Sequence, residues 1–492
     1  MKRTVSVGAA ILMMACGDNV APNLASLELV PSSPIHFAAV GDTVILSVSG
    51  TDDEGGAVAP SSLRFASRNP SVARVSQSGR IESTGDGSTY IVVQASELAD
   101  SVSVTVVQAR DSLVLGVPAP GKIISLPADT AFPLVCRAYD TAGNLLVLPT
   151  AVSSRSGRIS GASCETLTVT GSGHDTLEVT AGSYHASLPV VVAVRPRLLS
   201  DPSLPLDVDS LPDGLIPWAP TLVKNGSGEF NLYFAGYRNA AGHLGGRRGD
   251  LHRLVSPDGI HFQYDRVVLE RDAFPCSPRG TGIENVAIGP QDDGSGWRMF
   301  LAAGSNECGG WQVFSAVSDD EDNWIIEPGI RIPNGTSPRW PSGEGMSLEQ
   351  LPSGDWRMLV GSYERVTPAE DRFQITQWTS SDHLTWSYGG PVLTTRQVGP
   401  RARRSVYSPS VTDIAPGLKR MFFTGDDLDT PGGASRIYSA VSVDGVQWEV
   451  EGLVLGGGSV DYFYSTMTDG VLVFIRSVSG AHALGLARVE SR

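Results

Sequence analysis

The sequence predicts an all-β protein in which two small β-sandwiches are followed by a five-bladed β-propeller. First, the phrase Ser-x-Asp-x-x-x-Trp/Phe occurs four times, with successive copies 62 residues apart. A fixed period of that size is typical of an array of similar supersecondary units. Second, short alternating apolar stretches separated by turn residues fill the region before the array. Third, the chain has 55 Gly and 32 Pro, and no stretch has helical periodicity.

The beginning of the chain has the pattern of an export signal. Lys2 and Arg3 precede an apolar run over residues 5–15, which is too short to span a membrane. The run ends in Met-Met-Ala-Cys16, which resembles a bacterial lipobox, with an ordinary signal peptide ending in Cys as the alternative. We therefore expect residues 1–16 to be a lipoprotein signal with Cys16 as the acylated residue. The protein would be an exported lipoprotein of the cell envelope or cell surface, with the outer membrane favoured and the lipid as its only membrane anchor.

The remaining cysteines agree with an oxidising compartment. The chain has five cysteines, and without Cys16 they form two pairs, Cys136 with Cys164 and Cys276 with Cys308. Each pair falls within one predicted domain, as disulfides in an exported protein would. A two-cysteine metal site is the competing hypothesis, but no histidine lies near either pair. We expect no bound metal and no cofactor.

The net charge limits the classes of partner. The formal charge is −15 at pH 7, and the signal contributes two of the positive charges. An acidic body argues against nucleic acid and against electrostatic binding to anionic lipid surfaces. We expect a monomer whose partner is carbohydrate, for the reasons given by the propeller below.

Residues 24–107 and 108–195 are the two predicted sandwiches. The first has turn residues every eight to twelve positions, with a turn at 52–56, the phrase Ser67-Arg-Asn-Pro-Ser-Val-Ala-Arg-Val75 and the following Ser78-Gly-Arg-Ile81. This pattern resembles the second family of bacterial Ig-like domains. The second segment is similar but more diverged, with Asp140-Thr-Ala-Gly-Asn144 matching the first turn. The resemblance implies stalks that hold a distal module away from a membrane.

Residues 196–492 contain the array. The four phrases begin at Ser256, Ser318, Ser380 and Ser442. Each follows an apolar stretch and precedes another, so the Asp is expected in a hairpin turn and the Trp or Phe in the core. The phrase is similar to the Asp box of sialidases but one residue shorter, and such turns are structural. We expect the last blade to be completed by a strand from near residues 196–210, because closure removes exposed sheet edges.

The innermost strand of each blade lines the propeller axis, and function concentrates where these strands begin. The predicted ring of first residues is Trp218, Glu284, Glu344, Tyr407 and, in the fifth blade, Asp461. Aromatic side chains can stack on the apolar faces of a sugar, and carboxylates can act as acid and base in glycosidic cleavage. We therefore assign Glu344 and Glu284 as catalytic candidates, and Trp218, Tyr407 and Asp461 as substrate-binding candidates.

This architecture resembles the five-bladed glycoside hydrolases that include arabinanases, β-xylosidases, invertases and levansucrases. In the arabinanase and xylosidase branch the general acid is the Glu of a Glu-Gly-Pro motif, and Glu344-Gly345-Met346 is similar on the corresponding blade. The family also implies an Asp before Pro on the first two blades, but this chain has Ala219 and Asn285 there. Glu284, or Asp213 in the preceding loop, would have to replace the missing carboxylate.

Two other polar clusters have competing interpretations. Arg401, Arg403 and Arg404 lie just before Tyr407, and with Arg247, Arg248 and Arg339 they would bind an anionic substituent of the substrate if these loops share the funnel mouth. We select Arg404 as the substrate-binding candidate, with a solvated loop with counter-charges as the alternative interpretation. The cluster Asp426-Asp427-Leu-Asp429 is either a calcium site or, as we expect, a plain acidic turn.

Two hypotheses for function remain at this stage. The first is a surface-anchored lipoprotein whose propeller hydrolyses glycosidic bonds. The second is a non-catalytic glycan-binding or adhesion propeller displayed on the Ig-like stalk. The two glutamates and the flanking aromatics favour the first hypothesis, whereas Ala219 and Asn285 favour the second.

Overall fold

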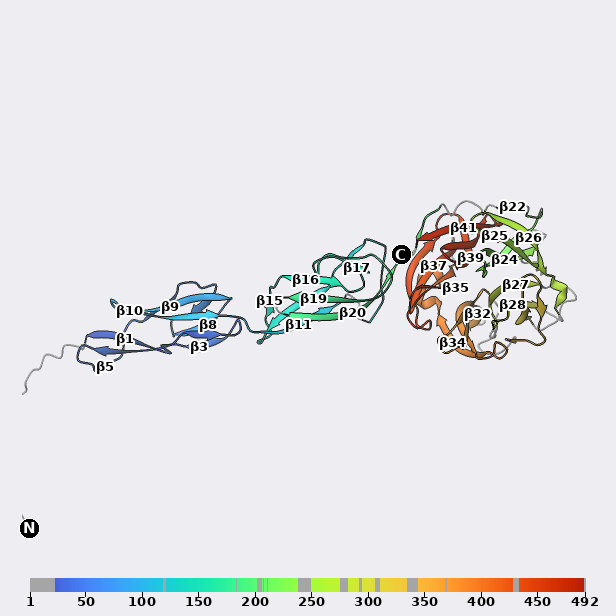
Figure 1. Ribbon diagram of the computed structural model, residues 1–492. Helices are drawn as coiled ribbons and strands as arrows, with labels where there is room; N and C mark the ends of the chain where they lie inside the picture. The colour runs from blue at the N-terminus through green and yellow to red at the C-terminus, as the bar shows by residue number, and fades with distance from the viewer. Residues whose placement is uncertain are drawn as a thin grey trace, which may run out of the picture. The chain divides into compact units, whose positions relative to one another are not determined.

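Strands form nearly all the regular structure of this chain (Figure 1). The computed structural model describes residues 23–117, 121–182, 184–200, 206, 208–209, 211–237, 249–274, 282–291, 294–305, 310–333, 344–367, 370–427 and 433–490. Its α-helix, α1 (Thr395–Val398), has four residues. No helix within these ranges is long and apolar enough to cross a membrane. The signal segment with Cys16, and also Cys276 and Cys308, lie outside the described residues.

Residues 24–106 form three small sheets around one apolar core. The core takes residues from all three sheets, including Leu29, Ile81 and Val104. The sheet orders are β1 (Leu24–Val30), β4 (Ser47–Asp52), β5 (Ala57–Val58); β2 (Ile35–Phe37), β10 (Leu98–Val106), β9 (Gly87–Ala95), β6 (Arg64–Ser67); and β3 (Thr43–Ile45), β8 (Arg80–Ser83), β7 (Ala73–Val75).

Residues 110–194 repeat this strand order element for element. The orders are β11 (Arg110–Gly116), β14 (Val135–Asp140), β15 (Leu145–Leu146); β12 (Ile124–Leu126), β20 (Tyr184–Val194), β19 (Gly173–Ala181), β16 (Thr150–Ser154); and β13 (Ala131–Phe132), β18 (Leu167–Val169), β17 (Ile159–Ser160). The matching turns also form the same bonds: Asp52 and Asp140 each accept backbone N–H groups two and four residues later. Cys136 and Cys164 are both disulfide-bonded, as predicted.

The chain forms two compact units, and their boundary falls inside the second set of strands. One unit comprises Met1–Leu115, Val135–Thr150 and Thr180–Ala186. The other comprises Gly116–Leu134, Ala151–Val179 and Ser187–Arg492. The second set of strands therefore contributes residues to both units.

The remaining strands form five sheets. They are β23 (Ile216–Lys224), β24 (Phe230–Tyr237), β25 (Asp250–Ser256), β26 (Phe262–Leu269), β22 (Val208–Asp209); β27 (Ile283–Pro290), β28 (Trp297–Ser305), β29 (Gly310–Ser318), β30 (Ile325–Ile326); β31 (Met346–Gln350), β32 (Trp356–Thr367), β33 (Glu370–Ser380), β34 (Ser387–Leu393); β35 (Ser405–Ala415), β36 (Leu418–Asp426), β37 (Ser435–Ser442), β38 (Glu449–Leu455); and β39 (Val460–Thr468), β40 (Val471–Val478), β41 (Ala481–Glu490), β21 (Arg197–Leu198). Neighbouring strands in these sheets are antiparallel, except that β22 pairs parallel with β26.

These five sheets close on themselves in a propeller-like array. Five apolar clusters each join neighbouring sheets, and one of them joins the fifth sheet to the first through residues such as Phe463 and Phe234. The strand before the array closes it, because Leu198 of β21 pairs with Val489 of β41, as predicted. The first strands β23, β27, β31, β35 and β39 contact their neighbours in turn and surround a common axis.

The four repeated phrases form the expected turns, each between the third and fourth strand of its sheet. In the third sheet the Oδ1 atom of Asp382 accepts bonds from the Ser380 hydroxyl and from the N–H groups of Leu384 and Thr385. Those backbone bonds lower the pKa of Asp382 to about 2. Trp386 is buried and donates its indole N–H to the His383 carbonyl. These residues stabilise the turn and lie away from the axis.

Candidate functional site

Four of the five first strands are irregular where the first strands approach one another. The pairing register shifts between Trp218 and Thr221, and likewise in β27, β35 and β39. Ala219, Ser408 and Tyr464 have left-handed φ values of 42°, 52° and 49°. A bulge with a left-handed residue redirects the neighbouring side chains, so these irregularities define which side chains face the axis.

Glu344 and Tyr464 form the central contact of this region. The Tyr464 hydroxyl donates a hydrogen bond to Oε2 of Glu344. Tyr464 is 3% exposed, and burial together with the carboxylates of Glu344 and Glu284 raises its pKa well above its usual value near 10. The charges of both candidate catalytic carboxylates therefore raise the pKa of the same buried phenol, that of Tyr464. Glu344 is half-buried, whereas Glu284 is 2% exposed.

The position after Glu344 requires a glycine, Gly345, for two reasons. It has φ +86°, and a Cβ atom there would lie 2.2 Å from the Cα atom of Ser408. The backbone N–H of Ser408 donates to the Glu344 carbonyl at 2.7 Å. The Glu-Gly pair therefore joins the third sheet to the fourth directly below the carboxylate.

Trp218 does not have the role that we predicted for it. Its side chain is 7% exposed and packs against Phe463 at 5.3 Å, Tyr464 at 5.1 Å and His482 at 5.3 Å between ring centroids. A ring enclosed in this way belongs to the apolar core and cannot offer a face for stacking on a sugar. The bulge at Ala219 places it there.

Tyr407, a predicted substrate-binding residue, packs against Tyr464. It is half-buried, with its ring centroid 5.6 Å from that of Tyr464 and 6.0 Å from that of Phe373. Burial and the negative charges of Asp426 and Glu344 raise its pKa well above 10. The positive charge of Arg404 partly offsets this effect, because it lowers the pKa of Tyr407. The backbone N–H of Arg404 donates to the Asp426 carbonyl at 3.1 Å.

Asp461 is not the ring residue of the fifth sheet. Its Oδ1 accepts a bond from the backbone N–H of Ser435 at 3.0 Å, so it joins β39 to β37. The bulge in β39 places Tyr464, three residues later, against Glu344. The sequence analysis missed Tyr464, although it ends the aromatic run Tyr462-Phe-Tyr that could have indicated it. Asp213, the alternative second carboxylate, is an exposed turn residue.

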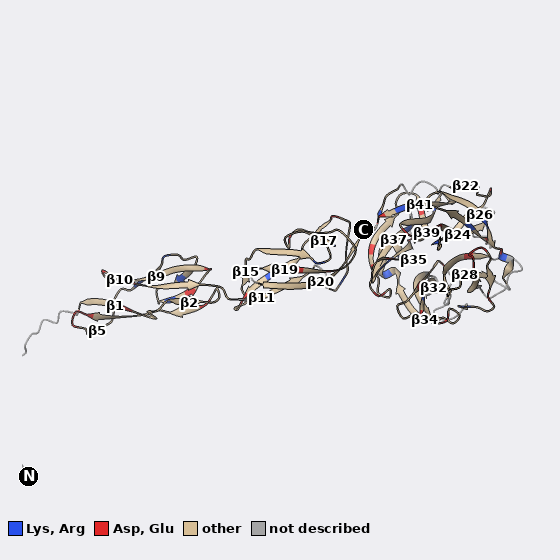
Figure 2. Cartoon of the chain, viewed as in Figure 1, with Lys and Arg blue, Asp and Glu red and all other residues tan. Residues whose placement is uncertain are grey.

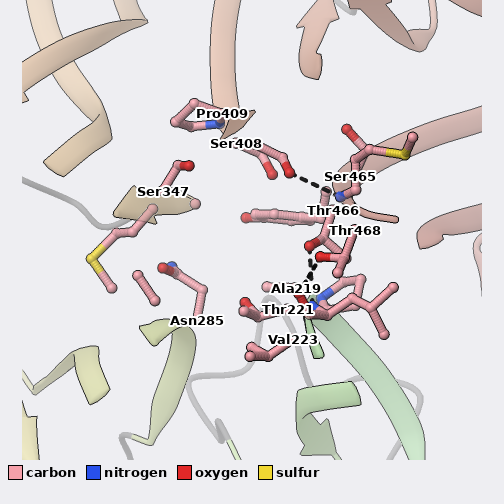
Figure 3. Close-up of a pocket in the computed structure, with 18 of the residues that line it drawn as sticks. Ala219, Thr221, Val223, Asn285, Ser347, Ser408, Pro409, Ser465, Thr466 and Thr468 are labelled. Carbon is pink, nitrogen blue, oxygen red and sulfur yellow. Dashed lines mark hydrogen bonds between the residues drawn. The ribbon is translucent and has the colours of Figure 1, made fainter. Parts of the chain in front are cut away.

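Below the ring the axis is hollow. A cavity of about 260 Å³ is lined by residues of all five first strands (Figure 3). Tyr464 and Gly345 belong to both the ring and the cavity, whereas Glu284, Glu344, Trp218 and Tyr407 do not line it. Asn285 points into the cavity and is 2% exposed, and neither atom of its amide has a hydrogen-bond partner among the described residues. The same holds for the hydroxyl of Ser465, which is 3% exposed.

No group of three or more metal-ligating side chains occurs within the described ranges. Asp427 accepts a backbone bond from Ala434 at 2.9 Å and pairs with Arg436 at 3.0 Å, so its carboxylate is held by protein donors. This arrangement favours the acidic turn over a calcium site. Asp429 and the loop arginines Arg247, Arg248 and Arg339 lie outside the described residues. Figure 2 shows Lys and Arg positions and Asp and Glu positions scattered over the strands and loops.

No protein-family model and no curated protein matches this sequence. Solved structures of similar fold include one described as a glycoside hydrolase, which is 13% identical with a TM-score of 0.46 over 59% of this chain and 91% of that chain. A thermostable family-43 glycoside hydrolase is 13% identical with a TM-score of 0.43 over 58% and 92%. The GH43_1 enzyme from Xanthomonas citri complexed with xylotriose is 15% identical with a TM-score of 0.42 over 58% and 89%. Likenesses at this level concern the fold alone.

Proposed function

We propose that this protein is an exported, surface-anchored lipoprotein in which two Ig-like domains carry a five-bladed propeller that hydrolyses glycosidic bonds. The observation that supports the chemistry best is the hydrogen bond from the Tyr464 hydroxyl to Glu344. This bond joins the half-buried Glu344 carboxyl to a fixed donor, and the charge of Glu284 also raises the pKa of that donor.

Each of these groups has a distinct task in hydrolysis. Glu344 is half-buried and serves as the general acid that protonates the leaving sugar oxygen. Glu284 is the second carboxylate that the reaction requires, and its charge, like that of Glu344, raises the pKa of Tyr464. Tyr464 keeps its proton at any physiological pH because its pKa is raised, so it remains a donor that orients the Glu344 carboxyl.

Substitution of the two glutamates tests this proposal. Glu344→Gln keeps the size and hydrogen bonding of the side chain but removes the transferable proton, so turnover should fall at least a hundredfold. Glu284→Gln should also lower turnover, and Asp213→Asn is the matched control that should not. The assay is release of the aglycone from a panel of aryl glycosides, followed by plant and microbial polysaccharides. Hydrolysis that survives both glutamine substitutions would remove these residues from the mechanism.

The alternative is a propeller that binds glycans without cleaving them. Ala219 and Asn285 favour it, because the related hydrolases have carboxylates at those positions and Asn285 cannot activate water as a base. Calorimetry separates the two functions: glycan binding by the wild type with no detectable turnover on the same glycan would establish the binding function instead.

A further inference from the structure

The axial cavity has two chemically different ends. At the end next to Tyr464 its walls are fully buried and include Asn285 and Ser465. Towards the ends of the first strands its lining residues are half-buried and apolar, namely Val223, Ile288, Leu348 and Val411. Lys224, which is exposed, lies beyond them. The cavity is therefore closed and polar near the ring and open through an apolar collar at the opposite end of the strands.

The unused hydrogen-bonding capacity of the cavity is concentrated at its closed end. Other hydroxyl groups in the walls join neighbouring strands: Thr221 donates to the Val286 carbonyl at 2.6 Å, and Ser410 accepts from the Met467 N–H at 2.9 Å. Asn285, by contrast, presents two N–H donors and one carbonyl acceptor without protein partners within the described chain, and Ser465 presents a hydroxyl. Buried polar groups are almost always satisfied, so these two residues indicate an occupant that both donates and accepts.

The charge and size of the cavity restrict that occupant. Lys224 is the charged residue among those that line it, and its ammonium group pairs with Asp469. A neutral occupant is therefore favoured over an anion or a cation, because a charge would be buried without a counter-charge. A volume of about 260 Å³ accommodates one sugar ring, whose hydroxyls would reach the polar end while its C–H face contacts the collar.

We propose that the axial cavity is a second binding site, for one neutral sugar ring that enters from the end opposite the Glu344 carboxylate. Asn285 is its main recognition residue and Ser465 its second. Glu344 and Glu284 do not line the cavity, whereas Tyr464 and Gly345 belong both to it and to the ring.

Calorimetry with neutral monosaccharides tests this site. Glucose, galactose, mannose, xylose and arabinose are titrated separately into the full chain, with glucuronic acid as the charged comparison. Asn285→Leu removes the amide at similar volume and should weaken the binding of a neutral sugar about tenfold or more, since it loses hydrogen bonds at a buried position. Ser465→Ala, a smaller change that the fold tolerates more readily, should weaken it less. Asp213→Asn, at an exposed turn, should leave this binding unchanged.

A crystal structure of the sugar complex supplies the second measurement, with the sugar expected in contact with Asn285. Binding that survives Asn285→Leu and Ser465→Ala but is lost in Glu344→Gln would place the sugar at the carboxylates and overturn the proposal. A cavity filled by ordered water alone at saturating sugar would overturn it as well, as would preferential binding of glucuronic acid. Hydrolysis that survives Glu344→Gln and Glu284→Gln would refute the proposed mechanism but affects none of these outcomes, so the two proposals can fail separately.

Discussion

The buried ion pair between Arg420 and Glu451 provides the sharpest test of what stabilises the array. Arg420 Nε lies 2.7 Å from Glu451 Oε2, and Nη2 lies 2.9 Å from Oε1. The two side chains are 0% and 1% exposed. The same Nη2 also donates to the Val194 carbonyl at 2.7 Å, while Ser125 donates to Glu451 at 2.7 Å. This pair is therefore surrounded by protein on every side.

Arg420→Ala should lower the free energy of unfolding by about 3–5 kcal/mol. The cost comes from leaving the Glu451 carboxylate buried without a counter-charge, because partial loss of a buried pair is worse than loss of the whole pair. The double variant Arg420→Met, Glu451→Leu removes both charges at similar volume. It should therefore recover most of the loss, to within about 1 kcal/mol of the wild type.

Urea unfolding followed by tryptophan fluorescence measures this effect in the right part of the chain, since all nine tryptophans lie within residues 196–492. The control is Lys224→Ala, which breaks the more exposed Lys224–Asp469 pair and should cost less than about 1 kcal/mol. The reasoning would be refuted if Arg420→Ala cost no more than Lys224→Ala, or if the double variant were as unstable as the single one.

Three further predictions concern the turns at Asp382 and Asp140 and the contact of Gly345 between two sheets. Asp382→Ala should lower the free energy of unfolding by about 1 kcal/mol in urea titrations, because two backbone N–H groups lose a partner; no change would mean that water replaces the carboxylate. Gly345→Ala should prevent soluble expression or strongly lower the thermal midpoint, since its Cβ would lie 2.2 Å from the Ser408 Cα. Gly354→Ala, with φ +91° and open space around it, should lower the free energy of unfolding by only about 1 kcal/mol. Equal effects of the two substitutions would contradict the steric argument. Asp140, despite its burial, has a pKa lowered to about 2 by hydrogen bonds from Asn144 and Gln108. Its stabilising effect is therefore complete above about pH 4 and is lost as the pH falls towards about 2. The thermal midpoint measured by circular dichroism should fall less steeply with decreasing pH in Asp140→Asn than in the wild type.

The sequence was sufficient wherever a structure depends on residues close together in the chain. The Ser-x-Asp turns were predictable because the Asp carboxylate bonds to N–H groups only two and three residues later. Their regular spacing predicted the repeated sheets, and the turns at Asp52 and Asp140 predicted the two similar sets of strands. The pairing of Cys136 with Cys164 followed from their place within one predicted domain.

The composition of the ring was decided by tertiary structure. The sequence spacing predicted a ring of Trp218, Glu284, Glu344, Tyr407 and Asp461, but in the structure Trp218 is buried and Asp461 accepts a bond from the Ser435 backbone. A bulge or a left-handed residue changes which side chains of a strand face the axis, and no local pattern in the sequence marks Ala219 or Tyr464 as such a residue. The contact between Tyr464 and Glu344, 120 positions apart, exists only because the closure of five sheets brings their first strands together.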